Sequence, residues 1–305
     1  MQLKINDLGS VFKKAFNEWL DKDPFRQSAV IAYYAIFSLP GLLVLIISIA
    51  GYFFGKDPVN QNILAQVSST MGAATAEQIG QVLTKVSEAK STVWGSIIGI
   101  VILLLGATGV FVELQKSLNL IWQVKAVVPQ KKILSLLRAR LFSFGLILAI
   151  AFLLLISLVL STALASVSEW LKGDSSEFMG IIFNWLNFLF SLAVIAVLFA
   201  LIFKILPDAK IEWKHVWLGS GVTALLFSIG KTALAFYFGT AEPGSDYGAA
   251  GSIILIMLWV SYSSMILFFG AEFTAAYANR FSGKVPPTEM AVAESPSAKQ
   301  EASSK

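Results

Sequence analysis

The chain has 305 residues, of which 56% are hydrophobic and only 14% are charged, and its mean hydropathy is +0.72. A soluble protein of this composition would have too little polar surface to cover itself, so an ordinary soluble domain is excluded. The absence of cysteine excludes disulfide bonds, thiolate metal sites and cysteine nucleophiles. The net charge of +4 is typical of the basic cytoplasmic loops of a membrane protein, so we expect no nucleic-acid partner.

Residues 1–28 are expected to form a cytoplasmic arm. Within this arm, Asp7–Asp21 carries apolar residues at helical spacing with Lys13 and Lys14 between them, which predicts an amphipathic helix. Such a helix could lie in the cytoplasmic membrane interface or pack on the body of the protein, and its sequence is compatible with both. The first apolar run begins only at Ala29 and is too long for the apolar core of a signal peptide, so we expect none.

Six apolar stretches follow, and each has the roughly 20 residues that a helix needs to cross a bilayer. We therefore predict an all-α integral membrane protein whose membrane domain covers residues 29–281. The predicted spans are residues 29–54, 93–112, 141–164, 181–203, 216–238 and 249–271. Residues 56–92 are expected to form short amphipathic helices in an extracytoplasmic loop, and residues 282–305 a disordered cytoplasmic tail.

Lysine and arginine are distributed unevenly among the segments that connect these spans. Eighteen of them lie in the N-terminal arm, the second and fourth linkers and the C-terminal tail, whereas the remaining linkers contain four. Basic residues are enriched in cytoplasmic loops, so this pattern predicts that both termini are cytoplasmic.

Lys231 is the only formal charge within the six predicted spans. The other members of its helix face are small or partly polar: Ser220, Ala224, Ser228 and Ala235. Faces of this kind pack against other helices or line a cavity. The ammonium could meet an anionic group such as a lipid phosphate, or it could extend to the membrane surface or pair with Glu242 or Asp246.

Two carboxylates complete the set of candidate substrate-binding residues. Glu113 follows Gly99 and Gly106 at intervals of seven residues, so the three share one face of the second predicted span. Glu113 could bind a proton or a cation, although a structural pair with a lysine or arginine is the favoured interpretation. Glu272 lies at the cytoplasmic end of the sixth span and could contact Glu113 or a basic loop residue. The candidates are therefore Lys231, Glu113, Ser228 and Glu272.

Catalytic and metal-binding patterns are missing from the sequence. His215 is the only histidine, and carboxylates are not clustered as they are in metal-dependent nucleases. No glycine-rich phosphate loop is present either. We therefore predict that the protein is not an enzyme and holds no metal and no cofactor.

Four groups of short motifs carry a resemblance to a known family. They are Ala32-Tyr33-Tyr34-Ala35 leading into Ser38-Leu39-Pro40-Gly41, Leu118-Asn119-Leu120-Ile121-Trp122, Ile205-Leu206-Pro207-Asp208 followed by Trp213 and Gly219, and Tyr247-Gly248-Ala249-Ala250-Gly251-Ser252. Over residues 10–280 the chain resembles the YihY/BrkB family of bacterial inner-membrane proteins. The resemblance implies a six-helix envelope protein with both termini inside. It implies no catalytic residues, and the ribonuclease label that some members have carried is generally regarded as a misassignment.

Together these features predict a multi-pass inner-membrane protein that transports a lipid or another amphipathic anion and contributes to envelope integrity. A non-transporting scaffold that recruits envelope proteins is the alternative, and a membrane-bound ribonuclease is the least favoured hypothesis. The expected partners are membrane lipids and envelope proteins. The substrate, the energy source and the oligomeric state are not determined by the sequence.

Overall fold

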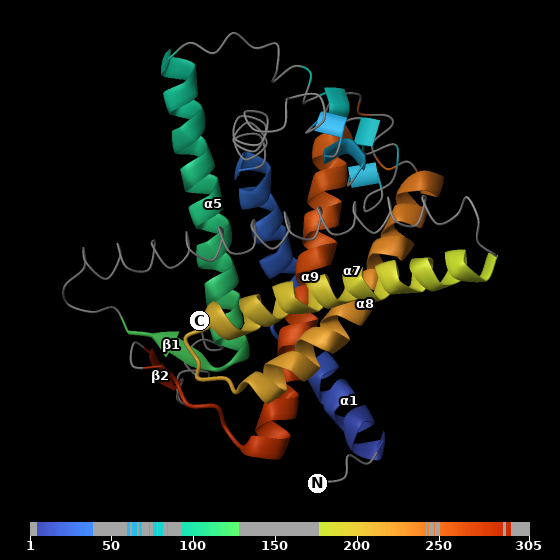
Figure 1. The fold of residues 1–305 in the computed structure, drawn as a ribbon. Helices are drawn as coiled ribbons and strands as arrows, with labels where there is room; N and C mark the ends of the chain where they lie inside the picture. Colours follow the sequence, from blue (N-terminus) through green and yellow to red (C-terminus); the bar gives the residue numbers. More distant parts are fainter. Residues whose placement is uncertain are drawn as a thin grey trace. The chain divides into compact units, whose positions relative to one another are not determined.

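The computed structural model describes residues 5–38, 93–127, 177–241, 251–288 and 291–293, together with scattered positions between 60 and 84 and residues 243 and 247. This part of the chain is helical apart from one short sheet (Figure 1). Its named elements are α1 (Ile5–Asp21), α5 (Val93–Ile121), β1 (Val124–Ala126), α7 (Glu177–Ile205), α8 (Trp213–Ala241), α9 (Gly251–Ser282) and β2 (Ala291–Ala293). Residues 24–38 are also helical.

Three helices in the described residues are long and apolar enough to cross a membrane. They are Trp185–Ile205, Trp213–Ala241 and Gly251–Ser282. These helices coincide with the last three predicted spans, and α5 covers the whole of the second. The first predicted span is described only as far as residue 38, and the third lies outside the described residues.

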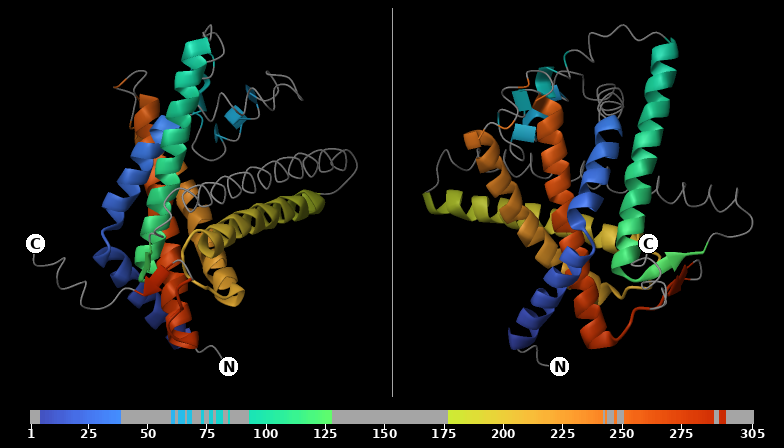
Figure 2. Two further views of the ribbon diagram at one scale, coloured as in Figure 1. Left: turned by 90° about the vertical axis from the view of Figure 1, so that its left-hand side faces the viewer. Right: turned by 180° about the vertical axis from the view of Figure 1, so that it is seen from behind.

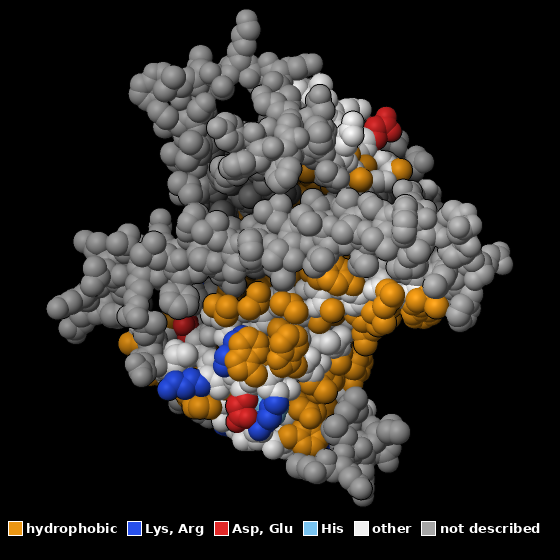
Figure 3. Space-filling model, in the orientation of Figure 1, with side chains coloured by type: hydrophobic (Ala, Val, Ile, Leu, Met, Phe, Trp, Pro, Cys, Tyr) orange, Lys and Arg blue, Asp and Glu red, His pale blue; other side chains and the backbone are white. Residues whose placement is uncertain are grey.

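The outward surfaces of these helices are apolar, as contact with lipid tails requires. Among the large hydrophobic side chains that are exposed, Trp185 and Leu189 lie on α7, and Leu225, Ile229 and Phe236 lie on α8. In the space-filling view, hydrophobic side chains cover much of the visible described surface, and charged groups gather in a few places (Figure 3). The described part of the chain is therefore that of a helical membrane protein.

The chain forms two compact units, which are described separately. Unit 1 comprises Met1–Trp19, Gln115–Leu226 and Leu267–Lys305, and unit 2 comprises Leu20–Leu114 and Phe227–Ile266. Helices α5, α8 and α9 each contribute to both units, because the boundaries fall within them.

In unit 1, α8 and α9 meet at two matching Gly-x-x-x-Thr segments. A side chain at Gly219 of α8 would collide with Thr274 of α9, and one at Gly270 of α9 would collide with Thr223 of α8. Each threonine hydroxyl donates a hydrogen bond to the carbonyl of the glycine one turn earlier on its own helix, at 2.6 Å for Thr223 and 2.7 Å for Thr274. The glycines let the helices approach closely, and the buried hydroxyls are satisfied within their own helices.

Helix α1 packs against α9 in the same unit. Val11 and Ala15 are buried against Phe269, Phe273 and Ala276 of α9. The neighbouring α1 side chains Phe12 and Phe16 remain 44% exposed. The sequence allowed α1 either to lie in the membrane interface or to pack on the body of the protein, and in the structure it packs on the body. One apolar side of α1 remains exposed.

In unit 2, glycines bring α5 close to the helix of residues 24–38. The Cβ of a residue replacing Gly106 would lie 2.8 Å from the backbone nitrogen of Ser38, and one replacing Gly109 would collide with the ring of Tyr34. The two helices lie side by side in both views of Figure 2. Gly106, on the helix face that it shares with Gly99 and Glu113, thus permits close helix packing.

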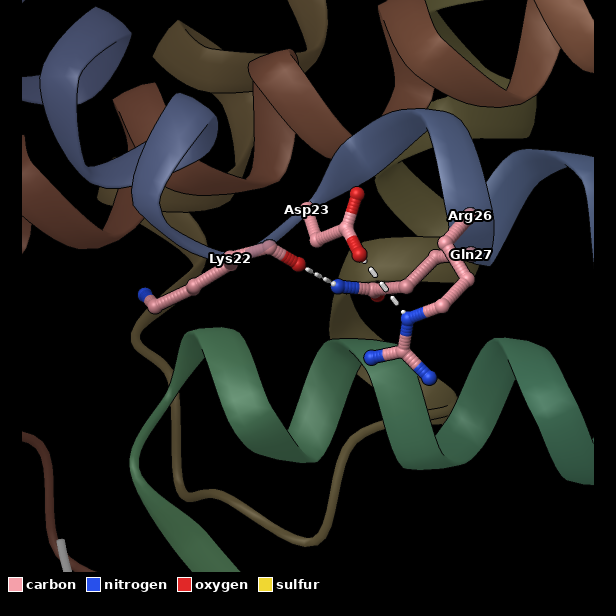
Figure 4. Close-up of polar contacts among 4 residues, drawn as sticks. All are labelled: Lys22, Asp23, Arg26 and Gln27. Carbon is pink, nitrogen blue, oxygen red and sulfur yellow. Dashed lines mark hydrogen bonds and ion pairs between the residues drawn. The ribbon is translucent and has the colours of Figure 1, made fainter. Parts of the chain in front are cut away.

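A tight turn joins α1 to the helix of residues 24–38 (Figure 4). Asp23 adopts a positive φ of 54°, a conformation that Asp tolerates better than most residues. Its carboxylate accepts a hydrogen bond from Arg26 at 2.9 Å. The buried side chain of Gln27 donates to the carbonyl of Lys22. These bonds stabilise the turn.

The Gly-Thr contact gives a test with a matched control on the same helix. We expect Gly219→Ala to lower the free energy of unfolding by about 1–3 kcal/mol, because the new methyl group overlaps Thr274. Gly221→Ala should be neutral or stabilising by up to about 1 kcal/mol, since no atom lies within 4 Å of its Cβ position. Thermal unfolding in detergent measures both, and an equal loss in the two variants would contradict this account of the contact.

Candidate functional site

A polar network joins the end of α5 to the loop between α7 and α8, within unit 1. Asn119 donates to the carboxylate of Asp208 at 2.8 Å, and its side-chain oxygen accepts from the backbone N–H of Asp208, also at 2.8 Å. Gln115, one turn earlier on α5, donates to the same carboxylate oxygen at 3.2 Å. Hydrogen bonds to a charged group are among the stronger ones in proteins, so Asp208 anchors this loop to α5.

The segment after α9 is joined to the same loop. Thr288 N–H donates to the carbonyl of Asp208, and Lys210 N–H donates to the carbonyl of Pro286, both at 2.9 Å. Further along, β2 pairs antiparallel with β1, the strand that follows α5 (Figure 1). The chain that leaves α5, the α7–α8 loop and the chain that leaves α9 are therefore held together by backbone and side-chain hydrogen bonds.

Basic side chains are numerous where α7 ends and α8 begins. Lys204 donates to the carbonyl of Ile211, and its ammonium lies 5.6 Å from the ring centre of Trp213. Glu212 and Lys214 form an exposed ion pair at 2.6 Å. The hydrogen bond and the charge of Lys214 lower the pKa of Glu212. An exposed pair of this kind contributes little to stability.

His215 has a structural environment. Its ring is buried, and Nε2 lies 2.9 Å from the Ser282 hydroxyl oxygen, which connects the start of α8 to the end of α9. Tyr277 packs against the same ring, with 5.6 Å between ring centres. Within the described residues there is no group of three or more histidine or acidic side chains that could hold a metal ion.

The sequence-predicted site residues lie on three helices. Ser228 and Lys231 are one turn apart on α8 and are half-buried, and Glu113 on α5 is half-buried as well. These three belong to unit 2, whereas Glu272 on α9 belongs to unit 1, where it is only 1% exposed. Helical spacing thus brings Ser228 and Lys231 together, and the carboxylates stand on other helices.

Lys231 lies on the buried face of α8. Ala224 and Phe238, seven residues before and after it on the same face, are 0% and 1% exposed. Ile229 and Phe236, on the opposite face, are 68% and 72% exposed. No carboxylate pairs with Lys231 among the described residues, and its two suggested partners, Glu242 and Asp246, lie outside them. Lys231 is therefore a half-buried cation on the less exposed side of α8.

The Asn119–Asp208 network was not among the predicted site residues. Both residues occur in motifs that carry the family resemblance, and this is the sequence signal that could have identified them. Their separation of 89 positions hid the contact.

The long apolar helices with exposed apolar surfaces and the glycine-mediated packing between them define a helical integral membrane protein. The family model described as "Virulence factor BrkB" matches residues 15–294. The chain therefore belongs to the BrkB family, as the motifs predicted.

Relatives named as UPF0761 membrane proteins support the same class. The chain is 26% identical to one from Saccharophagus degradans over 278 residues, which is 90% of this chain and 60% of the relative. It is 31% identical to one from Tolumonas auensis over 182 residues, 58% of this chain and 56% of the relative. A Vibrio vulnificus relative is 26% identical over 83% of this chain and 78% of its own length. The matches to the first two thus span less than two thirds of those relatives, and no solved structure matches the chain.

The polar network can be tested by a double-mutant cycle. We expect Asp208→Ala and Asn119→Ala each to lower the free energy of unfolding by about 2–3 kcal/mol, because each leaves a buried or half-buried partner without its hydrogen bonds. The double variant should reveal a coupling of about 1–3 kcal/mol between them.

Glu212→Ala is the matched control, because it removes an exposed acid from the same loop. It should change stability by no more than about 0.5 kcal/mol. Additive effects of Asp208→Ala and Asn119→Ala would show that the two side chains do not act as a unit.

Proposed function

We propose that this protein binds an amphipathic anion within the membrane and moves it across, with Lys231 as the cationic contact for the anionic group. The position of Lys231 carries the proposal. A charge inside a membrane span is costly and is retained where it meets a ligand, a counter-ion or a water-filled space. On α8 that charge is half-buried and shares a helix face with the buried Ala224 and Phe238, which supports a contact with a ligand.

The surroundings of Lys231 suit such a ligand. Ser228 stands one turn away and can offer a hydroxyl to the same anionic group. At the adjacent position, a Cβ on Gly230 would lie 2.7 Å from the Ile266 and Tyr262 side chains of α9, so the two helices are in close contact there. Helix α8 is thus supported by α9 next to the residue that would carry the charge. A fixed helix is the kind of element on which a binding side chain can be positioned.

The number of spans, the location of the termini and the identity of the membrane are part of the same proposal. We infer six spans with both termini in the cytoplasm, in the inner membrane of a bacterium, from the apolar runs and from the distribution of lysine and arginine. The protein acts on lipid or a lipid-like anion, has no catalytic activity, and contributes to envelope integrity through that movement. Membrane lipids and envelope proteins are its partners.

Reconstituted vesicles test the role of Lys231. In vesicles that contain a fluorescent phosphatidylglycerol, Lys231→Met should slow the protein-dependent movement between leaflets by about tenfold to a hundredfold, the loss expected for one hydrogen bond to a charged group. Lys231→Arg should retain most of the rate because it keeps the charge. Lys284→Met, which removes an exposed lysine after α9, is the matched control.

Two results would contradict the proposal. One is a parent protein that moves no more phosphatidylglycerol, and no more of a second anionic lipid, than protein-free vesicles do. The other is a Lys231→Met variant as active as the parent. The first result would favour the non-transporting scaffold.

A further inference from the structure

A cleft lies between α1 and α9 in unit 1, apart from every residue assigned above to transport. Its volume is about 190 Å³, and it is lined by Ser10, Val11, Lys14, Ala276, Asn279 and Arg280. Val11 and Ala276 are buried and form its apolar floor, whereas the four polar side chains are exposed at its rim. At roughly 30 Å³ for each water molecule, the cleft has the volume of about six waters.

The rim of the cleft is cationic and rich in hydrogen-bond donors. Lys14 comes from α1 and Arg280 from α9, so two helices contribute one positive charge each. Ser10 and Asn279 add a hydroxyl and an amide. Glu18 lies 3.7 Å from Lys14; Lys14 is exposed and Glu18 is half-buried, and such a surface pair competes weakly with a ligand. A phosphate ester carries a negative charge and several acceptor oxygens, so it can accept hydrogen bonds from these side chains and balance their positive charge.

The α9 residues of the cleft lie beyond residue 271, where the sixth predicted span ends. A helix of 32 residues is about 48 Å long, whereas the hydrocarbon core is about 30 Å thick, so we expect these last turns of α9 to lie at the level of the lipid headgroups. Trp19 of α1 packs against Phe269 of α9, and the α1 residues of the cleft meet α9 about two to three turns nearer its end. Helix α1 therefore runs antiparallel to α9, with an aromatic group toward the membrane and the cationic cleft toward water, as is typical of an interface.

We propose that this cleft binds the phosphate of an anionic phospholipid from the membrane leaflet next to it. Because the cleft has one wall on α1 and the other on α9, the bound lipid would tie the N-terminal arm to the membrane domain. The exposed Phe12 and Phe16 on α1 place apolar surface on the same helix, as in helices that lie against lipid. The site would hold a lipid in place and is independent of the movement assigned to Lys231.

The test compares two charge-matched double variants of the full-length protein in neutral detergent. Retention of phosphatidylglycerol and phosphatidylcholine is measured by native mass spectrometry, and lipid-dependent stability by thermal unfolding. The parent should retain phosphatidylglycerol about tenfold more strongly than phosphatidylcholine, and Lys14→Gln with Arg280→Gln should abolish that preference, a change of about 1.4 kcal/mol. Lys13→Gln with Lys284→Gln removes the same charge from exposed positions outside the cleft and should leave the preference within about twofold.

Stability gives a second readout of the same binding. Phosphatidylglycerol should raise the unfolding temperature of the parent, because a ligand that binds only the folded state stabilises it, and the cleft variant should lose this increase. If the double variant does not fold, Lys14→Gln alone carries the test and should weaken retention by about threefold, part of the effect of a single exposed charge.

Three results would overturn the assignment. Equal losses in the two double variants would show that only the net charge matters. Equal retention of the two lipids by the parent would show that the cleft does not recognise an anionic headgroup. Displacement of phosphatidylglycerol by millimolar inorganic phosphate or glycerol phosphate would show that the site binds a small soluble anion instead of a lipid.

Discussion

The close contact between α8 and α9 is the constraint on which the remaining assignments depend. Lipid tails are as apolar as the helix surfaces, so the hydrophobic effect does not drive two apolar helices together in a membrane. The contact therefore relies on small residues, close packing and hydroxyls that are hydrogen-bonded within their own helices. Gly219 against Thr274 and Gly270 against Thr223 supply all three. This contact fixes the rotation of α8 about its own axis. Further along α8, Ala224 and Phe238, which share a helix face with Lys231, are buried, whereas Ile229 is exposed.

The polar network at the end of α5 solves a different problem, that of holding loops that have little regular structure. Asp208 lies in a short α7–α8 connection and is bonded by Asn119, by Gln115 and, through its carbonyl, by Thr288. The β1–β2 pair extends the same association by three residues on each strand. An anchored loop keeps the ends of α7 and α8 from separating, so the network supports from one end the helix that carries Lys231.

Hydropathy predicted the helices well and their ends poorly, for a physical reason. Apolar runs mark the part of a helix that lies in hydrocarbon, whereas α5 continues from the predicted end at Val112 to Ile121 through polar residues that belong to the interface. The shared face of Gly99, Gly106 and Glu113 was predictable because their spacing of seven residues is visible in the sequence. The partners of Gly219 and Asp208 were not predictable, since they lie 55 and 89 positions away on other elements. Strands of three residues, such as β1 and β2, carry too short a pattern to be recognised.

The central claim is that Lys231 faces a protein-lined space that an anion can enter, and the absence of native cysteine makes it directly measurable. Lys231→Cys and Ile229→Cys can each be exposed to a water-soluble anionic thiol reagent in reconstituted vesicles, with labelling rates compared in the presence and absence of phosphatidylglycerol. The account predicts that Lys231→Cys is labelled, that phosphatidylglycerol slows its labelling, and that Ile229→Cys stays unlabelled in lipid. Labelling of Ile229→Cys as fast as Lys231→Cys, or no labelling of Lys231→Cys at all, would contradict it.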